Sequence, residues 1–151
     1  MRNVLLILFM TLVTGCVSVK IPKYLQEESS YKKKYYASFD ETLAATKKTL
    51  QSQGWVITDT ADPIAFEQNQ DYDPSQGKRV LLFTEPRQTS MILFSRYSAL
   101  NAYVRTLAND STEVELRYHS ETPVFFAHFK TSKNDHFIEK LFERIAQDLE
   151  K

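Results

Sequence analysis

The chain has few of the residues from which redox and catalytic sites are commonly built. It contains one cysteine and three glycines in 151 residues. One cysteine allows no disulfide within the chain. Three glycines, one of them Gly15 near the N-terminus, are too few for a Gly-rich phosphate loop, and the G-x-S-x-G sequence of acyl transfer is absent. We therefore expect a protein that is not an enzyme and needs no cofactor.

Groups that titrate near neutrality are few and badly spaced for metal binding. The three histidines, His119, His128 and His136, lie nine and eight residues apart, which matches no compact metal signature. The carboxylates of Glu113 and Glu115 share one strand face, but we expect them to be surface charges of a hairpin rather than an acid–base pair. The sequence predicts no metal site and no catalytic residue.

One loop partly resembles a calcium site in its spacing. Asp71, Asp73 and Ser75 occupy the first, third and fifth positions of such a loop. The sixth position, which needs glycine, is Gln76, and the twelfth, which needs a bidentate glutamate, is Leu82. A polar turn is therefore the better interpretation, with weak adventitious calcium binding as the alternative.

A strong excess of one charge is also missing. The formal net charge of the chain is zero, and acidic residues outnumber basic ones from residue 35 onward. Nucleic-acid binding requires a basic face. We expect no nucleic-acid partner.

The most informative feature that is present is the apolar run at the N-terminus. After Arg2, residues 4–13 (VLLILFMTLV) carry no charge. A membrane-spanning helix needs roughly 20 apolar residues, so this run is too short. A positive start, a short apolar stretch and small residues after it are typical of a secretory signal.

The only cysteine follows this run directly, since Val13, Thr14 and Gly15 precede Cys16. This order resembles the lipobox of bacterial lipoproteins. The resemblance implies that residues 1–15 are a signal peptide, that the Cys16 thiol receives diacylglycerol, and that its amino group receives an acyl chain such as palmitate. The absence of aspartate after Cys16 then implies an outer membrane, with the protein facing the periplasm. An ordinary secreted protein and an uncleaved anchor are the alternatives.

Beyond Cys16 the composition divides the chain into two parts. Residues 16–34 contain one proline, a serine pair and five lysines, without hydrophobic periodicity. We interpret them as a flexible tether that follows the lipid. Residues 35–151 are long enough to bury a core and form one periplasmic domain.

Hydrophobic patterns predict the elements of this domain. A strand over 35–39 is followed by a helix from Asp40, its expected N-cap, to Gln53, and Gly54 suits a left-handed C-cap. Strands are predicted at 55–58, 64–66, 78–85, 90–97, 101–108 and 112–120.

The C-terminal helix has the clearest pattern. From residue 134 or 135 to 150, one broad apolar stripe is formed by Phe137, Ile138, Leu141, Phe142, Ile145 and Leu149. Such a helix must lie on a sheet. The predicted fold class is α+β, an antiparallel sheet with a β-α-β opening and both helices on one face.

Part of this pattern resembles the helix-grip domains of outer-membrane assembly lipoproteins of the BamC type. The likeness is carried by Ser38, Phe39 and Asp40, by Leu43 and Leu50, and by residues 54–57 (GWVI). It implies a helix-grip-like fold and a non-catalytic lipoprotein that acts through contacts. It transfers no functional residue.

A candidate contact surface lies in residues 123–129 (PVFFAHF). If this stretch is extended, Val124, Phe126 and His128 face one way and Phe125, Ala127 and Phe129 the other. We expect Phe126 and His128 to contact an envelope protein or an apolar ligand. The alternative is a last strand packed under the C-terminal helix. The predicted function is a lipid-anchored interaction or assembly module, and the alternative is a lipoprotein that binds a small ligand or lipid in a groove between helix and sheet.

Overall fold

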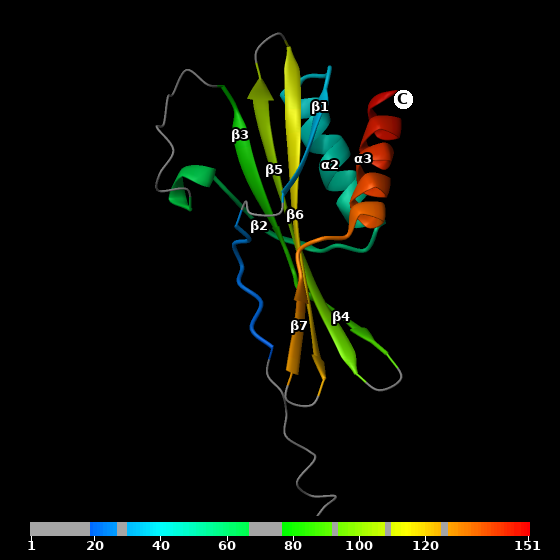
Figure 1. Cartoon of the computed structure of the whole chain (residues 1–151). Coiled ribbons are helices and arrows are strands. Elements are labelled where there is room, and N and C mark those ends of the chain that lie inside the picture. The colour runs from blue at the N-terminus through cyan, green and yellow to red at the C-terminus, as the bar shows by residue number, and fades with distance from the viewer. Residues whose placement is uncertain (1–18, 27–29, 67–76, 92–93, 108–109, 125–126) are drawn as a thin grey trace, which may run out of the picture.

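The computed structural model of the chain describes residues 19–26, 30–66, 77–91, 94–107, 110–124 and 127–151. It has an antiparallel sheet and two helices, so the α+β class is confirmed (Figure 1). In chain order the elements are β1 (Ser30–Tyr35), α2 (Phe39–Ser52), β2 (Ile57–Ala61), the 3-10 helix η2 (Pro63–Ala65), β3 (Arg79–Thr84), β4 (Arg87–Ser90), β5 (Ser95–Leu107), β6 (Ser111–Val124), β7 (Ala127–Thr131) and α3 (Asp135–Leu149).

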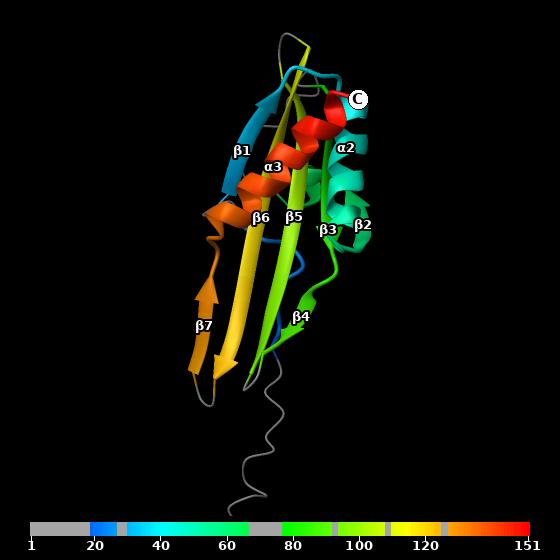
Figure 2. The same ribbon diagram turned by 90° about the vertical axis from the view of Figure 1, so that its right-hand side faces the viewer.

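Two long strands organise the sheet. β5 and β6 have 13 and 14 residues and pair over eleven positions. Towards Leu107 this pair is flanked by β1 and β3, and the order is β1-β6-β5-β3-β2. At the other end β4 pairs with β5 and β7 pairs with β6. We call the described residues of 87–98 and 120–131 the distal end; it projects beyond both helices (Figure 2).

Both helices lie on one face of the other half of the sheet, as predicted (Figure 2). The Tyr35 hydroxyl donates to the carbonyl of Phe142 (2.9 Å), and burial raises the pKa of this phenol. The predicted stripe of α3 is confirmed, because four of its six residues are fully buried and the other two partly. The core under the helices contains Leu50, Trp55, Leu82, Leu100, Ala102, Val104, Val114, Leu116, Ile138, Leu141, Phe142 and Ile145.

Side-chain caps fix where the helices start. Ser38, not Asp40, is the N-cap of α2, and it forms a capping box with Glu41. Asn134 caps α3 by accepting from the Phe137 N–H. After α2, Gly54 takes the left-handed conformation (φ 78°) that was expected there. Within the described residues, neither helix has the length and hydropathy needed to cross a membrane.

The N-terminal residues 19–26 cover part of the opposite face of the sheet (Figure 1). The N–H of Leu25 donates to Asn101 (2.7 Å), and its carbonyl accepts from Arg117 (3.1 Å). Arg117 is 1% exposed and also donates to the Tyr24 hydroxyl (2.7 Å) and to Glu115 (2.6 Å). A buried charge pair is tolerated only when such additional hydrogen bonds compensate for the lost water. Residues 19–26 therefore pack on this face and cover part of it.

The predicted flexible tether over residues 16–34 is wrong for the part that the structure describes. Residues 19–26 pack on the sheet, and β1 pairs with β6. The lysine run suggested a solvated segment, but alternate residues of a strand point to opposite faces. Tyr35 thus reaches the core while Lys34 stays exposed. The folded domain begins before residue 35.

Several predicted strands also need correction. Residues 35–39 are not a strand, because β1 ends at Tyr35 and α2 begins at Phe39. The stretch 64–66 falls at a 3-10 helix that begins at Pro63, a residue without the N–H that a sheet ladder needs. The strands expected at 78–85 and 112–120 correspond to β3 and to most of β6.

The stretch 90–97, predicted as one strand, and the stretch 123–129, analysed as extended, each include parts of two antiparallel strands. In 90–97, β4 ends at Ser90 and β5 begins at Ser95, and the Met91 N–H donates to the Phe94 carbonyl (2.7 Å). In 123–129, β6 ends at Val124 and β7 begins at Ala127. All five residues of β7 are exposed, so this strand does not pack under α3.

We predict that residues 19–26 are needed for full stability. A chain beginning at Val19 should unfold at a clearly higher temperature than one beginning at Glu27. The shorter chain loses the burial of Leu25 and two partners of Arg117, together worth roughly 3 kcal/mol or more. Thermal unfolding followed by circular dichroism measures the difference. Equal midpoints would contradict the role given to this segment.

We also predict an acid-sensitive link between the helices. Asp148 of α3 accepts from Lys48 of α2 (2.8 Å) and from Lys151 (3.1 Å), which lowers its pKa from 3.8 to about 2. A lowered folded-state pKa stabilises the protein above pH 4, and this contribution is lost as the pH falls from about 4 to about 2. Asp148→Asn should therefore lower the melting temperature by a few degrees at pH 7 and lose this effect near pH 2.

The matched control is Glu139→Gln, since Glu139 is exposed on the same helix. It should have little effect at either pH. A constant difference between the Asp148→Asn variant and the natural chain from pH 7 to pH 2 would contradict the assignment.

Candidate functional site

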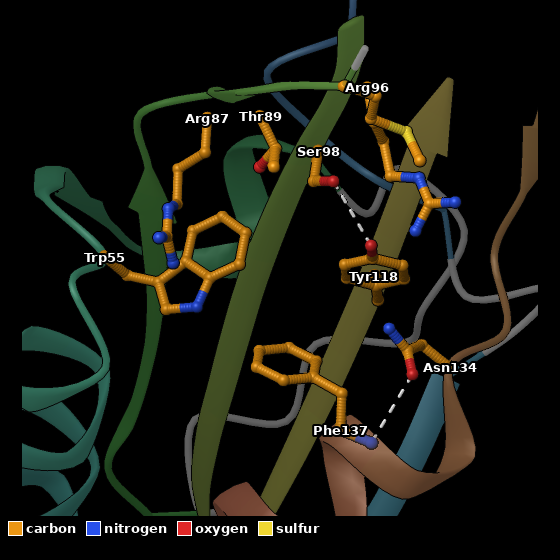
Figure 3. A pocket seen from close by; sticks show the side chains of 9 residues that line it. Trp55, Arg87, Thr89, Arg96, Ser98, Tyr118, Asn134 and Phe137 are labelled. Carbon is orange, nitrogen blue, oxygen red and sulfur yellow. Dashed lines mark hydrogen bonds between the residues drawn. The ribbon is translucent and has the colours of Figure 1, made fainter. Parts of the chain in front are cut away.

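A groove opens where the helices end and the distal end begins. It has a volume of about 240 Å³ and lies between the start of α3, Trp55 in the connection from α2 to β2, and strands β4, β5 and β6 (Figure 3). The groove exists because β5 and β6 continue beyond the helices that cover the core. Its lining consists of Trp55, Arg87, Thr89, Met91, Arg96, Ser98, Tyr118, Asn134 and Phe137.

Three aromatic rings form the apolar part of the groove. Phe137 lies 6.1 Å from Trp55 and 5.8 Å from Tyr118, measured between ring centroids. Both pairs are tilted, a favourable arrangement for aromatic rings. Asn134 orients the first turn of α3 and thereby holds Phe137 at the groove. The result is a rigid aromatic surface rather than a flexible apolar lining.

Polar donors surround this aromatic surface. The Arg87 guanidinium lies 4.9 Å from the Trp55 ring and donates to the Gln53 carbonyl (3.0 Å), so it both caps α2 and stacks on the indole. The hydroxyls of Ser98 and Tyr118 lie 3.2 Å apart. The groove thus has a fixed cation on one side and paired hydroxyls on another.

The groove has one buried donor without a partner in the described part of the chain, and one exposed cation. The indole N–H of Trp55 is buried without a hydrogen-bond partner there, although the residue is only 3% exposed. The side chain of Arg96 on β5 is exposed to water, and no side-chain hydrogen bond or ion pair joins it to another described residue. A buried unsatisfied donor is costly, so an acceptor at this position would be favourable. The lining contains no carboxylate, so the Trp55 N–H and the exposed guanidinium of Arg96 suit an anionic or carbonyl-bearing group.

Several sequence candidates lie elsewhere. Cys16 and Phe126 lie outside the described residues, as does the loop with Asp71 and Asp73. His128 of β7 is exposed and bonds through Nδ1 to Glu121. It is not part of the groove.

The other histidines do not converge with His128 on a metal site. Burial lowers the pKa of His119 in β6, and His136 is exposed on α3. In the part of the chain that the structure describes, no three histidine, cysteine or acidic side chains are arranged to hold a metal ion.

The carboxylates of Glu113 and Glu115 lie on the face opposite the helices, and each pairs with an arginine. Glu113 accepts from Arg105 (2.8 Å), and Glu115 accepts from Arg117 (2.6 Å). The expectation of surface charge is wrong for Glu115, which is 2% exposed. The N-terminal segment, interpreted as a tether, covers it.

The sequence allowed a groove between the terminal helix and the sheet as an alternative, but it did not predict which residues line it, although one signal was visible. Trp55 is the only tryptophan and follows a helix-ending glycine, and the sequence predicts it as the first residue of a strand over 55–58. Arg87 and Arg96 fall on strands that alternate too weakly to show which face they share. Their convergence requires the pairing of β4 with β5, which places Thr89 opposite Arg96.

The models of known protein families and the curated protein sequences with which the chain was compared give no match.

We predict that Arg87 shields Trp55 from solvent. Arg87→Ala removes the stacked guanidinium and the cap on Gln53, so neutral acrylamide should quench the Trp55 fluorescence more strongly. Stability should fall by about 1 kcal/mol. Arg96→Ala, a matched loss of one arginine at the same groove, should leave quenching unchanged. Equal quenching in the Arg87→Ala variant and the natural chain would contradict the stacking.

Proposed function

We propose that the chain is a lipid-anchored envelope lipoprotein that acts as a non-catalytic interaction module and binds its partner at the groove. The observation that carries this proposal is the buried, unpartnered indole N–H of Trp55 in a lining that also holds Arg96. Such donors, beside three aromatic rings, favour binding over catalysis, because binding sites combine apolar surface with a few placed polar groups.

The size of the groove favours a protein partner. Pockets for whole small ligands measure about 300–1,000 Å³. A volume of about 240 Å³ instead suits one or two side chains of a partner that enter as anchors. The exposed guanidinium of Arg96 suits a carboxylate beside an apolar anchor. We therefore propose a partner segment that presents an apolar side chain next to an acidic group.

A second candidate function is the binding of a small ligand or lipid in the same groove. It is favoured by the position of the groove between α3 and the sheet and by its aromatic lining. An amphipathic acid would place its carboxylate at Arg96 and its apolar body on Phe137. Both candidates use the same residues.

The envelope location rests on the lipobox at Cys16, and the assembly role rests on the likeness to BamC-type domains. The element order β1-α2-β2, the antiparallel sheet and the terminal helix α3 are consistent with a helix-grip-like domain with a β-α-β opening. We propose this architecture, with the lipid on Cys16 in the outer membrane and the domain in the periplasm.

Photocrosslinking in the native bacterium tests the groove. A benzoylphenylalanine residue at Thr89, in the groove, should form a discrete adduct with one envelope protein. The same residue at Glu143, exposed on α3, is the matched control and should form none. Arg96→Glu should abolish the adduct, since it places a like charge against the proposed carboxylate.

Mass spectrometry of the adduct separates the two candidates. A protein-sized gain in mass supports the interaction module, and a gain of lipid or metabolite size supports the ligand-binding alternative. Equal labelling at Thr89 and Glu143, or no adduct at Thr89, would contradict a binding role for the groove.

A further inference from the structure

The distal end combines exposed apolar side chains with the two hairpins of the sheet. Met91 and Phe94 flank the β4–β5 turn, and Phe129 lies on β7; they are 45%, 37% and 64% exposed. All residues of β4 and β7 are exposed, and neither helix covers this end (Figure 2). Large apolar side chains gathered at one end and left in water indicate an interaction surface.

Basic groups accompany this apolar surface. Arg96 is exposed on β5, beside Thr89 of β4. Lys130 follows Phe129 on β7 and points to the other face of this strand, with 62% of its side chain exposed, at 3.8 Å from Glu121. Aromatic and aliphatic side chains with lysine and arginine around them are the composition that favours the lipid–water interface.

The path of the N-terminal segment indicates what this surface meets. Leu25 bonds to Asn101 of β5, and Ile21 lies with Ala99 at a shared depression. From Leu25 back to Ile21, the chain thus runs along β5 towards the distal end. Figure 1 shows the same direction, since the blue segment of residues 19–26 runs down towards the lower part of the sheet.

Chain length then limits where the lipid can be. Cys16 is five residues before Ile21, and five residues span at most about 17 Å. The start of β5 at Ser95 is four residues beyond Ala99, or about 13 Å along the strand. The lipid on Cys16 can therefore reach the level of the distal end. The opposite end of β5, at Leu107, is about 26 Å from Ala99 in the other direction.

We infer that the distal end of the sheet rests on the membrane, with Met91, Phe94 and Phe129 in the interface and Lys130 at anionic headgroups. This inference rests on the lipid anchor of the proposed function. The lipid and the apolar side chains act together, because a covalent anchor raises the local concentration of the surface near the bilayer. The groove then opens near the lipid, since Met91 and Arg96 line the groove and also belong to the distal end.

The test uses the mature, lipidated protein in vesicles of phosphatidylethanolamine and phosphatidylglycerol. Because Cys16 carries the lipid, one added cysteine accepts a fluorophore specifically. We place it at Ala127, exposed on β7, or at Lys151, at the opposite end of the molecule (Figure 1). Nitroxide-labelled lipids should quench the fluorophore several-fold more strongly at Ala127→Cys than at Lys151→Cys.

A variant of two exposed residues tests whether their apolar side chains enter the bilayer. Met91→Ser with Phe129→Ser, added to Ala127→Cys, should remove most of the quenching. The protein should still float with the vesicles and keep its melting temperature, since both side chains are exposed. Equal quenching at the two sites, or quenching at Ala127→Cys that survives the double change, would overturn the inference while leaving the lipid anchor intact. A protein that does not float and has an unmodified Cys16 would remove the anchor itself, and the inference with it.

Discussion

The ladder between β5 and β6 is the constraint on which the rest of the structure depends. Thirteen and fourteen residues at about 3.3 Å each give strands of roughly 43 and 46 Å, whereas the 15 residues of α3 extend only about 22 Å. A helix of this length covers about half of the pair. The sheet therefore has one half with a core under two helices and one half without that cover. The groove lies at the boundary between them, where the side chains of both halves meet.

A second constraint acts on the opposite face, where Arg117 and Glu115 are buried together. Neither charge is stable there unless its remaining hydrogen-bonding groups find partners. The partners of Arg117 come from Tyr24 and the carbonyl of Leu25, so the buried pair fixes the course of residues 19–26. This path, rather than a free tether, determines how far Cys16 can be from any part of the domain. A charge pair in the sheet thus controls the position of the proposed lipid.

Sequence patterns predicted the parts of the fold that depend on local rules. The apolar stripe of α3, the helix α2 with Gly54 behind it, and the strand β3 all follow from periodicity and capping within a few residues. The failures have a different origin. β1 was missed because its lysines stand between tyrosines, and only pairing with β6 reveals that Tyr35 is buried. The lining of the groove was not predicted because Trp55, Arg96 and Phe137 are far apart in the chain and meet only through strand pairing and the packing of α3 on the sheet.

The groove and the membrane-facing surface of the distal end share residues, so the position of one limits access to the other. Met91 and Arg96 line the groove and also belong to the end that we infer to rest on lipid. With the distal end at the bilayer, a partner can enter the groove only along the membrane or from the side of α3, not through the hairpins. A large soluble domain would meet the headgroups before reaching Phe137. A membrane-proximal segment of a partner, or an amphipathic acid from the bilayer, could reach Phe137 without this obstruction. The position of the groove therefore selects occupants that are already held at the membrane.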